Sequence, residues 1–257
     1  MSIHPQAYVD PQADLGADVV VGPGAVIEAG AIIGTGCQIG PQAVIRSGTT
    51  LGPRCRVYPC AVIGDDPQDF AYDGAPSGVE IGAETVLREG VTVHRGTKPD
   101  TVTRIGDRCY LMANSHVAHN GHLGHDVILA NNVLLGGYVT IGDRAFLSGN
   151  CVVHQFCTVG RLAMMSGLSG LSKDCPPFCI VPDLTSNRVA ALNTVGLRRA
   201  GLSVEERTAL KRAFHMLYRE GLSVSQAIEA MQAAFPTGPA AELWQFAAQS
   251  KRGICSG

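Results

Sequence analysis

The sequence predicts an all-β fold, a parallel β-helix of hexapeptide repeats over residues 1–182, followed by a C-terminal α-helical domain over residues 183–257. The main observation is that aliphatic residues return every six positions from Val9 to Leu171, with two interruptions. A period of six fits neither the 3.6-residue turn of an α-helix nor the alternation of a long strand. Composition agrees, since 31 glycines and only 5% aromatic residues indicate an aliphatic core between tight turns.

Each hexad predicts one side of a three-sided prism, so that three hexads make one coil. The aliphatic residue would fill the prism, a small residue would pack beside it, and Gly or Asn would take the corner, where φ is positive. Six of the nine cysteines recur at one position of the repeat: Cys37, Cys55, Cys109, Cys151, Cys157 and Cys175. This placement favours small buried thiols over metal ligands, and no paired CxxC spacing exists.

Two interruptions of the repeat predict loops that leave the stack without disturbing it. The first covers about residues 65–78 and the second residues 99–104. Long loops on a rigid scaffold are common places for functional residues. We therefore expect the first loop, which contains Gln68 and Asp69, to contribute to a site.

The C-terminal part has helical signals. A capping box at Ser203 to Glu206 predicts a helix that ends near Glu220, a second box at Ser223 opens another, and residues 239–250 form a third. A stripe of apolar residues on the first of these helices would pack against the rest of the protein: Leu210, Phe214, Leu217 and Tyr218.

Composition excludes several classes of function. The net charge is −2, which gives no nucleic-acid footprint, and no apolar run approaches the roughly 20 residues of a transmembrane segment. The first residues lack the basic and apolar regions of an export signal, so we expect a cytoplasmic protein whose cysteines stay reduced.

The register of the repeat places several histidines on one side of the prism. Val117, Leu135 and Val153 should stack in successive coils, with Val93 one coil before Val117 and Ile63 one coil before that. The residues that follow these positions would then form one outer face: His94, His119, Tyr138, His154 and Gln155. Because His119 sits in the V-A-H-N-G-H hexad at the centre of this face, it is our candidate for the catalytic residue.

Other readings of the histidines remain open at this point. His122 and His125 fit polar turn residues that face solvent. The spacing of three from His116 through His119 to His125 could suggest zinc, but the members alternate between corner and face, so a single chain would not assemble a tetrahedral site. Ligands from two chains, as in hexapeptide-repeat carbonic anhydrases, are the remaining route to a metal. A non-catalytic β-helical scaffold is a further alternative.

The chain resembles the UDP-N-acetylglucosamine 3-O-acyltransferases that open lipid A biosynthesis, over nearly its whole length. The specific motifs are I-G-D-D-P-Q-D before Tyr72, V-T-V-H-R-G-T around His94, N-S-H-V-A-H-N around His119, V-H-Q-F-C around His154 and G-L-R-R-A-G from Gly196. This resemblance implies a left-handed β-helix and a homotrimer whose active sites lie between subunits. It also implies two substrates, a 3-hydroxyacyl-acyl carrier protein and a UDP-sugar, and no cofactor.

The resemblance also implies roles for individual residues. His119 would be the general base that activates the sugar 3-hydroxyl, because a neutral histidine can accept a proton near neutral pH. The N–H of Gly137 would stabilise the oxyanion. The remaining matched positions would bind substrate: Gln68, Asp69, His94, His116, Tyr138, His154, Gln155, Gly167, where acyl length is set, Asn193 near uracil, and Arg199 near phosphate.

Several positions depart from the family pattern. The acid after the catalytic histidine is Asn120, and the other replacements are Ala71, Tyr138, Val195 and Ala200. The reaction class survives these changes, whereas the acceptor sugar and the acyl length stay undetermined. An N-acyltransferase acting on a 3-amino UDP-sugar is therefore an alternative, since an amine is the better nucleophile.

Overall fold

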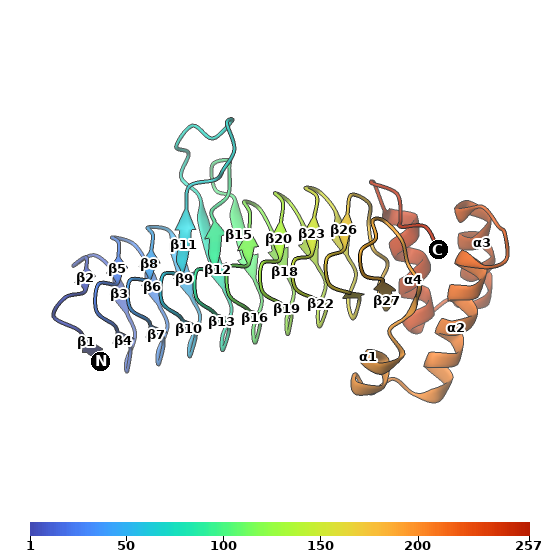
Figure 1. The fold of residues 1–257 in the computed structure, drawn as a ribbon, viewed down its shortest axis with the longest axis horizontal. Coiled ribbons are helices and arrows are strands. Elements are labelled where there is room, and N and C mark those ends of the chain that lie inside the picture. Colours follow the sequence, from blue (N-terminus) through green and yellow to red (C-terminus); the bar gives the residue numbers. More distant parts are fainter.

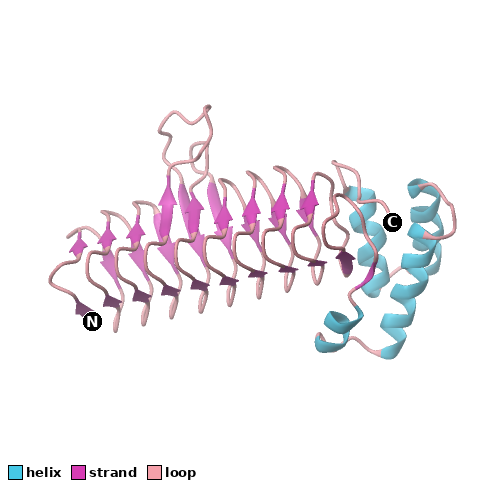
Figure 2. Ribbon diagram, viewed as in Figure 1, coloured by secondary structure: helices cyan, strands magenta, loops and turns pink.

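The structure is a computed structural model that describes residues 1–257. Short parallel strands stack into an elongated prism, and helices cover its C-terminal end (Figures 1 and 2). The arrangement fits the left-handed parallel β-helix that the sequence predicts. The all-β label holds only for this prism, because four helices follow it.

Three sheets form the sides of the prism, and successive coils pair in each of them. Sheet A contains β1 Ser2–Ile3, β4 Val20–Val21, β7 Gln38–Ile39, β10 Arg56–Val57, β13 Val86–Leu87, β16 Tyr110–Leu111, β19 Ile128–Leu129, β22 Phe146–Leu147, β25 Met164–Met165, β27 Cys179–Val181 and β28 Ala191–Leu192. Sheet B contains β2 Tyr8–Val9, β5 Val26–Ile27, β8 Val44–Ile45, β11 Val62–Asp65, β14 Thr92–His94, β17 His116–Val117, β20 Leu134–Leu135, β23 Val152–Val153 and β26 Gly170–Leu171. Sheet C contains β3 Asp14–Leu15, β6 Ile32–Ile33, β9 Thr49–Leu51, β12 Gly78–Ile81, β15 Val102–Ile105, β18 His122–Leu123, β21 Thr140–Ile141 and β24 Thr158–Val159.

The predicted register is confirmed in sheet B. Val117 pairs with Leu135, and Leu135 pairs with Val153. Val93 precedes Val117, and Ile63 precedes Val93, in the same column. All five side chains are at most 3% exposed, so each coil adds one aliphatic residue per side to a continuous core. The six cysteines of the repeat are also buried in this core.

The corners depart from the Gly and Asn rule. Positive φ occurs at Asn114, Asn120, Asn132 and Asn150, as predicted, but also at bulky residues such as Tyr138 (φ 58°). The left-handed conformation costs a bulky residue of order 1 kcal/mol, which the hydrogen bonds between coils offset at these positions.

Two loops project from the prism beside each other (Figure 1). The first joins β11 to β12, as predicted. The second covers residues 95–101 and not 99–104, because residues 102–104 pair with Gly78–Glu80 as part of β15. Arg95 fixes the base of the first loop by donating hydrogen bonds to the carbonyl oxygens of Gly64 (2.7 Å) and Ser47 (2.9 Å).

The helices are α1 Thr194–Arg199, α2 Val204–Tyr218, α3 Val224–Ala234 and α4 Gly238–Gln249. Both predicted capping boxes are present, Ser203 with Glu206 and Ser223 with Gln226. The predicted stripe on α2 packs inward, with Leu210 and Leu217 in the core and Phe214 and Tyr218 against it. No helix combines the length and the apolar character that crossing a bilayer requires.

The chain end is tied back to the prism by Asp174, which is 4% exposed. Its carboxylate accepts hydrogen bonds from the Thr158 N–H (2.7 Å) and the Ser250 hydroxyl (2.6 Å). Its backbone continues the connection, because the Asp174 carbonyl accepts from the Cys255 N–H (2.8 Å). This carboxylate therefore joins the last coils to the segment after α4.

Candidate active site

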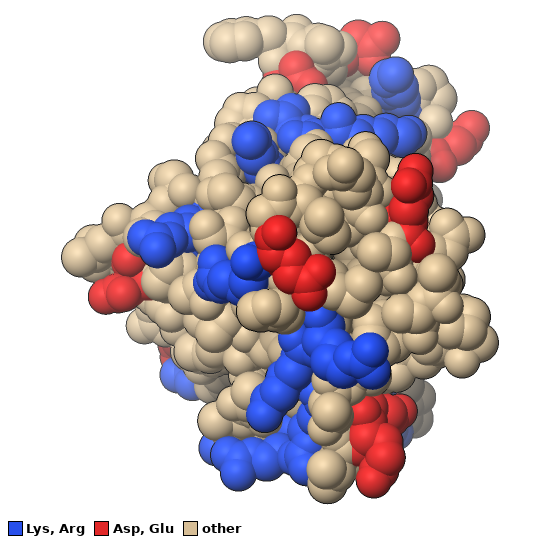
Figure 3. Space-filling model, turned by 90° about the vertical axis from the view of Figure 1, so that its right-hand side faces the viewer, with Lys and Arg blue, Asp and Glu red and all other residues tan.

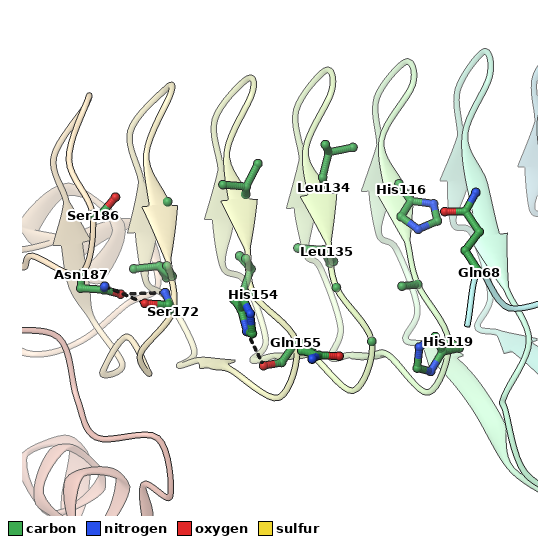
Figure 4. Close-up of a pocket in the computed structure, with 17 residues that line it drawn as sticks. Gln68, His116, His119, Leu134, Leu135, His154, Gln155, Ser172, Ser186 and Asn187 are labelled. Atoms are coloured by element: carbon green, nitrogen blue, oxygen red, sulfur yellow. Dashed lines mark hydrogen bonds between the residues drawn. The ribbon is translucent and has the colours of Figure 1, made fainter. Parts of the chain in front are cut away.

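A groove of about 610 Å³ runs along sheet B, from the loop containing Gln68 toward the C-terminal end (Figure 4). Its floor is formed by the strands that begin with His116, Leu134, Val152 and Gly170. These residues face out of the prism because they precede the buried core positions. The other lining residues are Gln68, Ala118, His119, Leu135, Gly136, Gly137, Val153, His154, Gln155, Leu171, Ser172, Ser186 and Asn187.

His119 lies at the corner that follows β17, and only 10% of its side chain is exposed. Its Nδ1 is 3.1 Å from Oδ1 of Asn120, and its Nε2 is 3.7 Å from Oδ2 of Asp69 on the first loop. The ring meets the ring of Tyr138 edge to face, with centroids 5.3 Å apart. The imidazole is thus held on one side by the corner, while Nε2 faces the groove and the loop.

Gly137 lies one coil after His119 and directly under its ring. A Cβ at this position would collide with the Cε1 and Nε2 atoms of His119, so only Gly permits the approach. The N–H of Gly137 donates no hydrogen bond within the chain. A free backbone donor therefore lies beside the candidate base, which is the arrangement that oxyanion stabilisation requires.

His94 is buried beside the partly buried His116, which lines the groove. Their rings meet edge to face with centroids 4.8 Å apart, and Nδ1 of His116 is 2.7 Å from Oγ1 of Thr92. Burial and the neighbouring histidines lower the pKa of His116 to about 4, and burial also lowers the pKa of His94. Both are therefore neutral near pH 7. His94 is only 6% exposed and does not line the groove.

His154 and Gln155 lie two coils beyond His119 and line the same groove (Figure 4). Nδ1 of His154 is 3.1 Å from the Gln155 carbonyl oxygen and 3.5 Å from a guanidinium nitrogen of Arg252. This end of the groove therefore lies close to the C-terminal segment and its positive charge.

Three predicted residues lie away from this groove. Asn193 and Arg199 line a separate cavity of about 530 Å³ on the outer face of sheet A, and Gly167 lines neither cavity. The Asn193 side chain is already engaged, because it accepts a hydrogen bond from the Gly196 N–H (2.9 Å) and donates one to the Leu162 carbonyl (2.9 Å). It caps α1, a helix that the sequence reading did not predict.

Sequence reasoning missed the apolar part of the groove. Leu134 and Val152 are 47% and 46% exposed, and with Gly170 they continue the row that His116 begins. The signal was present, because these residues follow His116 at a stride of 18, one coil each. Ser186 and Asn187, which close the far end, lie outside the repeat and carried no comparable signal.

The histidines spaced by three do not converge. His122 faces outward from sheet C, and His125 lies at the following corner, where it contacts Asp107. No group of three or more His, Cys, Asp or Glu side chains within the chain is placed to hold a metal ion.

The stacked hexads of this prism are the repeat of the hexapeptide-repeat transferases. The family description "bacterial transferase hexapeptide" matches residues 30–65, and "UDP N-acetylglucosamine O-acyltransferase, domain 2" matches residues 174–255. The chain belongs to the acyl-[acyl-carrier-protein]–UDP-N-acetylglucosamine O-acyltransferase family.

Relatives and solved structures carry this assignment. The family member from Alkalilimnicola ehrlichii is 48% identical, over 98% of both chains. One from Synechocystis is 47% identical over 65% of this chain and 60% of its own length. The solved UDP-N-acetylglucosamine acyltransferases of Bacteroides fragilis and Campylobacter jejuni superpose with TM-scores of 0.93, at 35% and 38% identity, and cover 98% and 99% of this chain and 99% of their own chains.

Proposed function

We propose that this protein transfers a 3-hydroxyacyl chain from acyl carrier protein to the 3-position of UDP-N-acetylglucosamine, the first step of lipid A biosynthesis. The observation that carries the proposal is the buried His119 with its ring over Gly137, at the head of a groove with an apolar floor. Family membership, with a relative 48% identical over 98% of the chain, supports the same reaction.

The reaction would proceed in three steps. Nε2 of His119 takes the proton of the 3-hydroxyl while that oxygen attacks the thioester carbonyl carbon. The carbonyl oxygen becomes an oxyanion that accepts a hydrogen bond from the Gly137 N–H. Collapse of the tetrahedral intermediate breaks the carbon–sulfur bond, and the departing thiolate takes the proton back from the imidazolium.

The groove separates the parts of the two substrates. Leu134, Val152 and Gly170 present an apolar strip over about 10 Å along the axis, at roughly 4.8 Å per coil, which suits an acyl chain. Gln68, Asp69 and His116 surround the head of the groove and would hold the sugar. The neutral state of His116 supports this role, because it leaves the residue free to exchange hydrogen bonds without charge.

The assembly would be a homotrimer with sites between subunits. Asn193 and Arg199 lie at the two ends of α1, beside the sheet A cavity, whereas His119 lies beside sheet B, so one chain does not bring them together. Outward-facing Ile128, Phe146 and Met164 form an apolar floor under the sheet A cavity. We infer that this face of one subunit lies against the groove of its neighbour, where Arg199 would meet the nucleotide phosphates.

This arrangement gives a complementation test. His119→Ala subunits and Arg199→Ala subunits would each be defective, but mixed trimers would contain sites with both residues intact. We expect co-refolded or co-expressed mixtures to recover a substantial fraction of wild-type activity. A mixture no more active than its components would place both residues in one chain's site and would exclude the shared geometry.

The acyl carrier protein would dock at the helical end. Exposed cationic side chains gather there, including Lys211, Arg212 and Arg219 on and after α2 and Lys251 beyond α4 (Figure 3). None of these four side chains forms an ion pair within the chain. Complementary charge would steer an acidic carrier toward the end of the groove near His154.

The nine free cysteines support a reducing, cytoplasmic setting.

A second acceptor, a 3-amino UDP-sugar, is favoured by one observation: Nδ1 of His119, the ring nitrogen away from the groove, contacts the neutral amide of Asn120 and not a carboxylate. An amine nucleophile demands less of the base. Purified protein should therefore be tested with 3-hydroxyacyl carrier proteins of several lengths and both sugars, with the product identified by mass. Transfer to the 3-hydroxyl supports the primary proposal, transfer only to the amine supports the second, and transfer to neither overturns both.

A further inference from the structure

Thr97 lies in the second projecting loop, between β14 and β15, and no role has been assigned to it so far. It is 8% exposed. The loop around it is braced by the first loop: the Asp100 N–H donates to the Pro76 carbonyl (2.9 Å), and the Ser77 hydroxyl donates to the Gly96 carbonyl (2.6 Å). Thr97 is therefore presented from a fixed backbone toward the corner that carries His119.

Thr97 makes two hydrogen bonds to the same atom of Asn120. Its backbone N–H lies 3.1 Å and its Oγ1 lies 3.0 Å from Asn120 Oδ1. A backbone N–H can only donate, so the amide atom that faces it must be the oxygen and not the NH2 group. The loop thereby fixes the orientation of the Asn120 amide.

That orientation determines the proton position on His119. The same Oδ1 atom is 3.1 Å from Nδ1 of His119. Because an amide oxygen only accepts, Nδ1 must carry the hydrogen in the neutral ring. Nε2 is then the atom with the free lone pair, and it faces the groove. The base would be ready in the tautomer that the proposed reaction requires.

Tyr138 completes the network from the other side. Its hydroxyl is 3.0 Å from Oγ1 of Thr97, and its ring packs edge to face on His119. Since the Thr97 hydroxyl hydrogen is directed to Asn120, the Tyr138 hydroxyl is the donor to Thr97. The hydrogen bonds therefore run from Tyr138 through Thr97 to Asn120, where the His119 N–H also ends.

We propose that Thr97 is a positioning residue that, through Asn120, holds His119 in the Nδ1–H tautomer, with Tyr138 restraining the Thr97 hydroxyl. The role of the tautomer rests on the proposed function, but the tautomer itself does not. In this chain a neutral amide, oriented by a loop donor, thus does the orienting that a charged partner would otherwise supply.

The test uses the full-length protein labelled with 15N in its histidines, and NMR to assign the His119 tautomer. We expect Nδ1–H in the wild type and in Asn120→Asp, which keeps an acceptor. We expect loss of that preference in Asn120→Leu, and a mixture of tautomers in Thr97→Val, which retains only the backbone donor. Asn132→Leu is the matched control, because Asn132 has the same left-handed backbone (φ 59°) at an exposed corner.

Kinetics give the second readout. Asn120→Leu should lower kcat by about 10- to 100-fold, with KM within about twofold of the wild type. Thr97→Val should lower kcat several-fold. Asn120→Asp, which keeps the acceptor, should have a kcat near that of the wild type. Asn132→Leu should match the wild type. Wild-type tautomers in both Thr97→Val and Asn120→Leu would overturn the proposal. If the wild type transfers no acyl group, the proposed function fails, while the spectra still decide the tautomer.

Discussion

Replacing Gly137 by Ala tests the closest contact in the site. The added Cβ would collide with the His119 ring, and restoring ordinary contact requires the ring to move by about 1 Å. The ring is held by Asn120 and Tyr138, so it can move only by losing those contacts. A displacement of about 1 Å in a catalytic group costs on the order of 100-fold in rate, or about 2.7 kcal/mol of activation free energy.

The assay is steady-state acyl transfer, with thermal unfolding measured on the same samples. Gly149→Ala is the matched control, since Gly149 holds the same position of the repeat and its Cβ would meet only the Asn131 carbonyl, at 3.5 Å. We expect Gly137→Ala to lose about 100-fold in kcat, while Gly149→Ala stays within about twofold and both remain folded. A Gly137→Ala enzyme within threefold of the wild type would refute the placement of the base over this glycine.

Three further predictions concern stability and the groove. The pKa of His116 is about 4 in the folded protein and near 6.5 in the unfolded chain, so the unfolded chain takes up the proton first as the pH falls. The free energy of unfolding should therefore fall by up to about 3 kcal/mol from pH 6.5 toward pH 4. His116→Gln should flatten this pH dependence, as measured by urea titrations. Asp174→Ala should lower the free energy of unfolding by about 2–4 kcal/mol and expose the last residues to protease, whereas Ser250→Ala should lower it by about 1 kcal/mol. Equal losses would contradict the role of Asp174 in joining the last coils to the segment after α4. Leu135→Ala should cost about 2–5 kcal/mol of unfolding free energy, because Leu135 is buried in the core. Leu134→Ala, half exposed in the groove, should cost less than about 1 kcal/mol but raise KM for the acyl donor. An unchanged KM would show that the acyl chain does not bind along the apolar strip.

The β-helix could be predicted because its repeat couples sequence directly to register. One aliphatic residue per hexad fixes which strands pair, as Val93, Val117 and Leu135 do. Helix α1 could not, since its six residues have no apolar period and Asn193 resembled a ligand rather than a cap. The left-handed Tyr138 and Leu162 also follow no local preference, because the stacked coils impose that backbone.

The site could be predicted in part. Register placed His119, His154 and Gln155 on one face, and the resemblance added Gly137; all four line the groove. It did not show that His94 is buried, with its ring against that of His116. Nor could it find Thr97, whose contact with Asn120 spans 23 residues and depends on the loop conformation. Loops take their geometry from tertiary contacts that no repeat encodes.

The most direct test of the account is turnover by wild type and His119→Ala with a 3-hydroxyacyl carrier protein and the preferred UDP-sugar, at saturating concentrations of both. The account predicts that kcat falls by roughly 10²- to 10⁴-fold, the range for losing a general base, with the fold intact. A His119→Ala enzyme that keeps kcat within about threefold of the wild type would contradict the central claim that this histidine takes the proton.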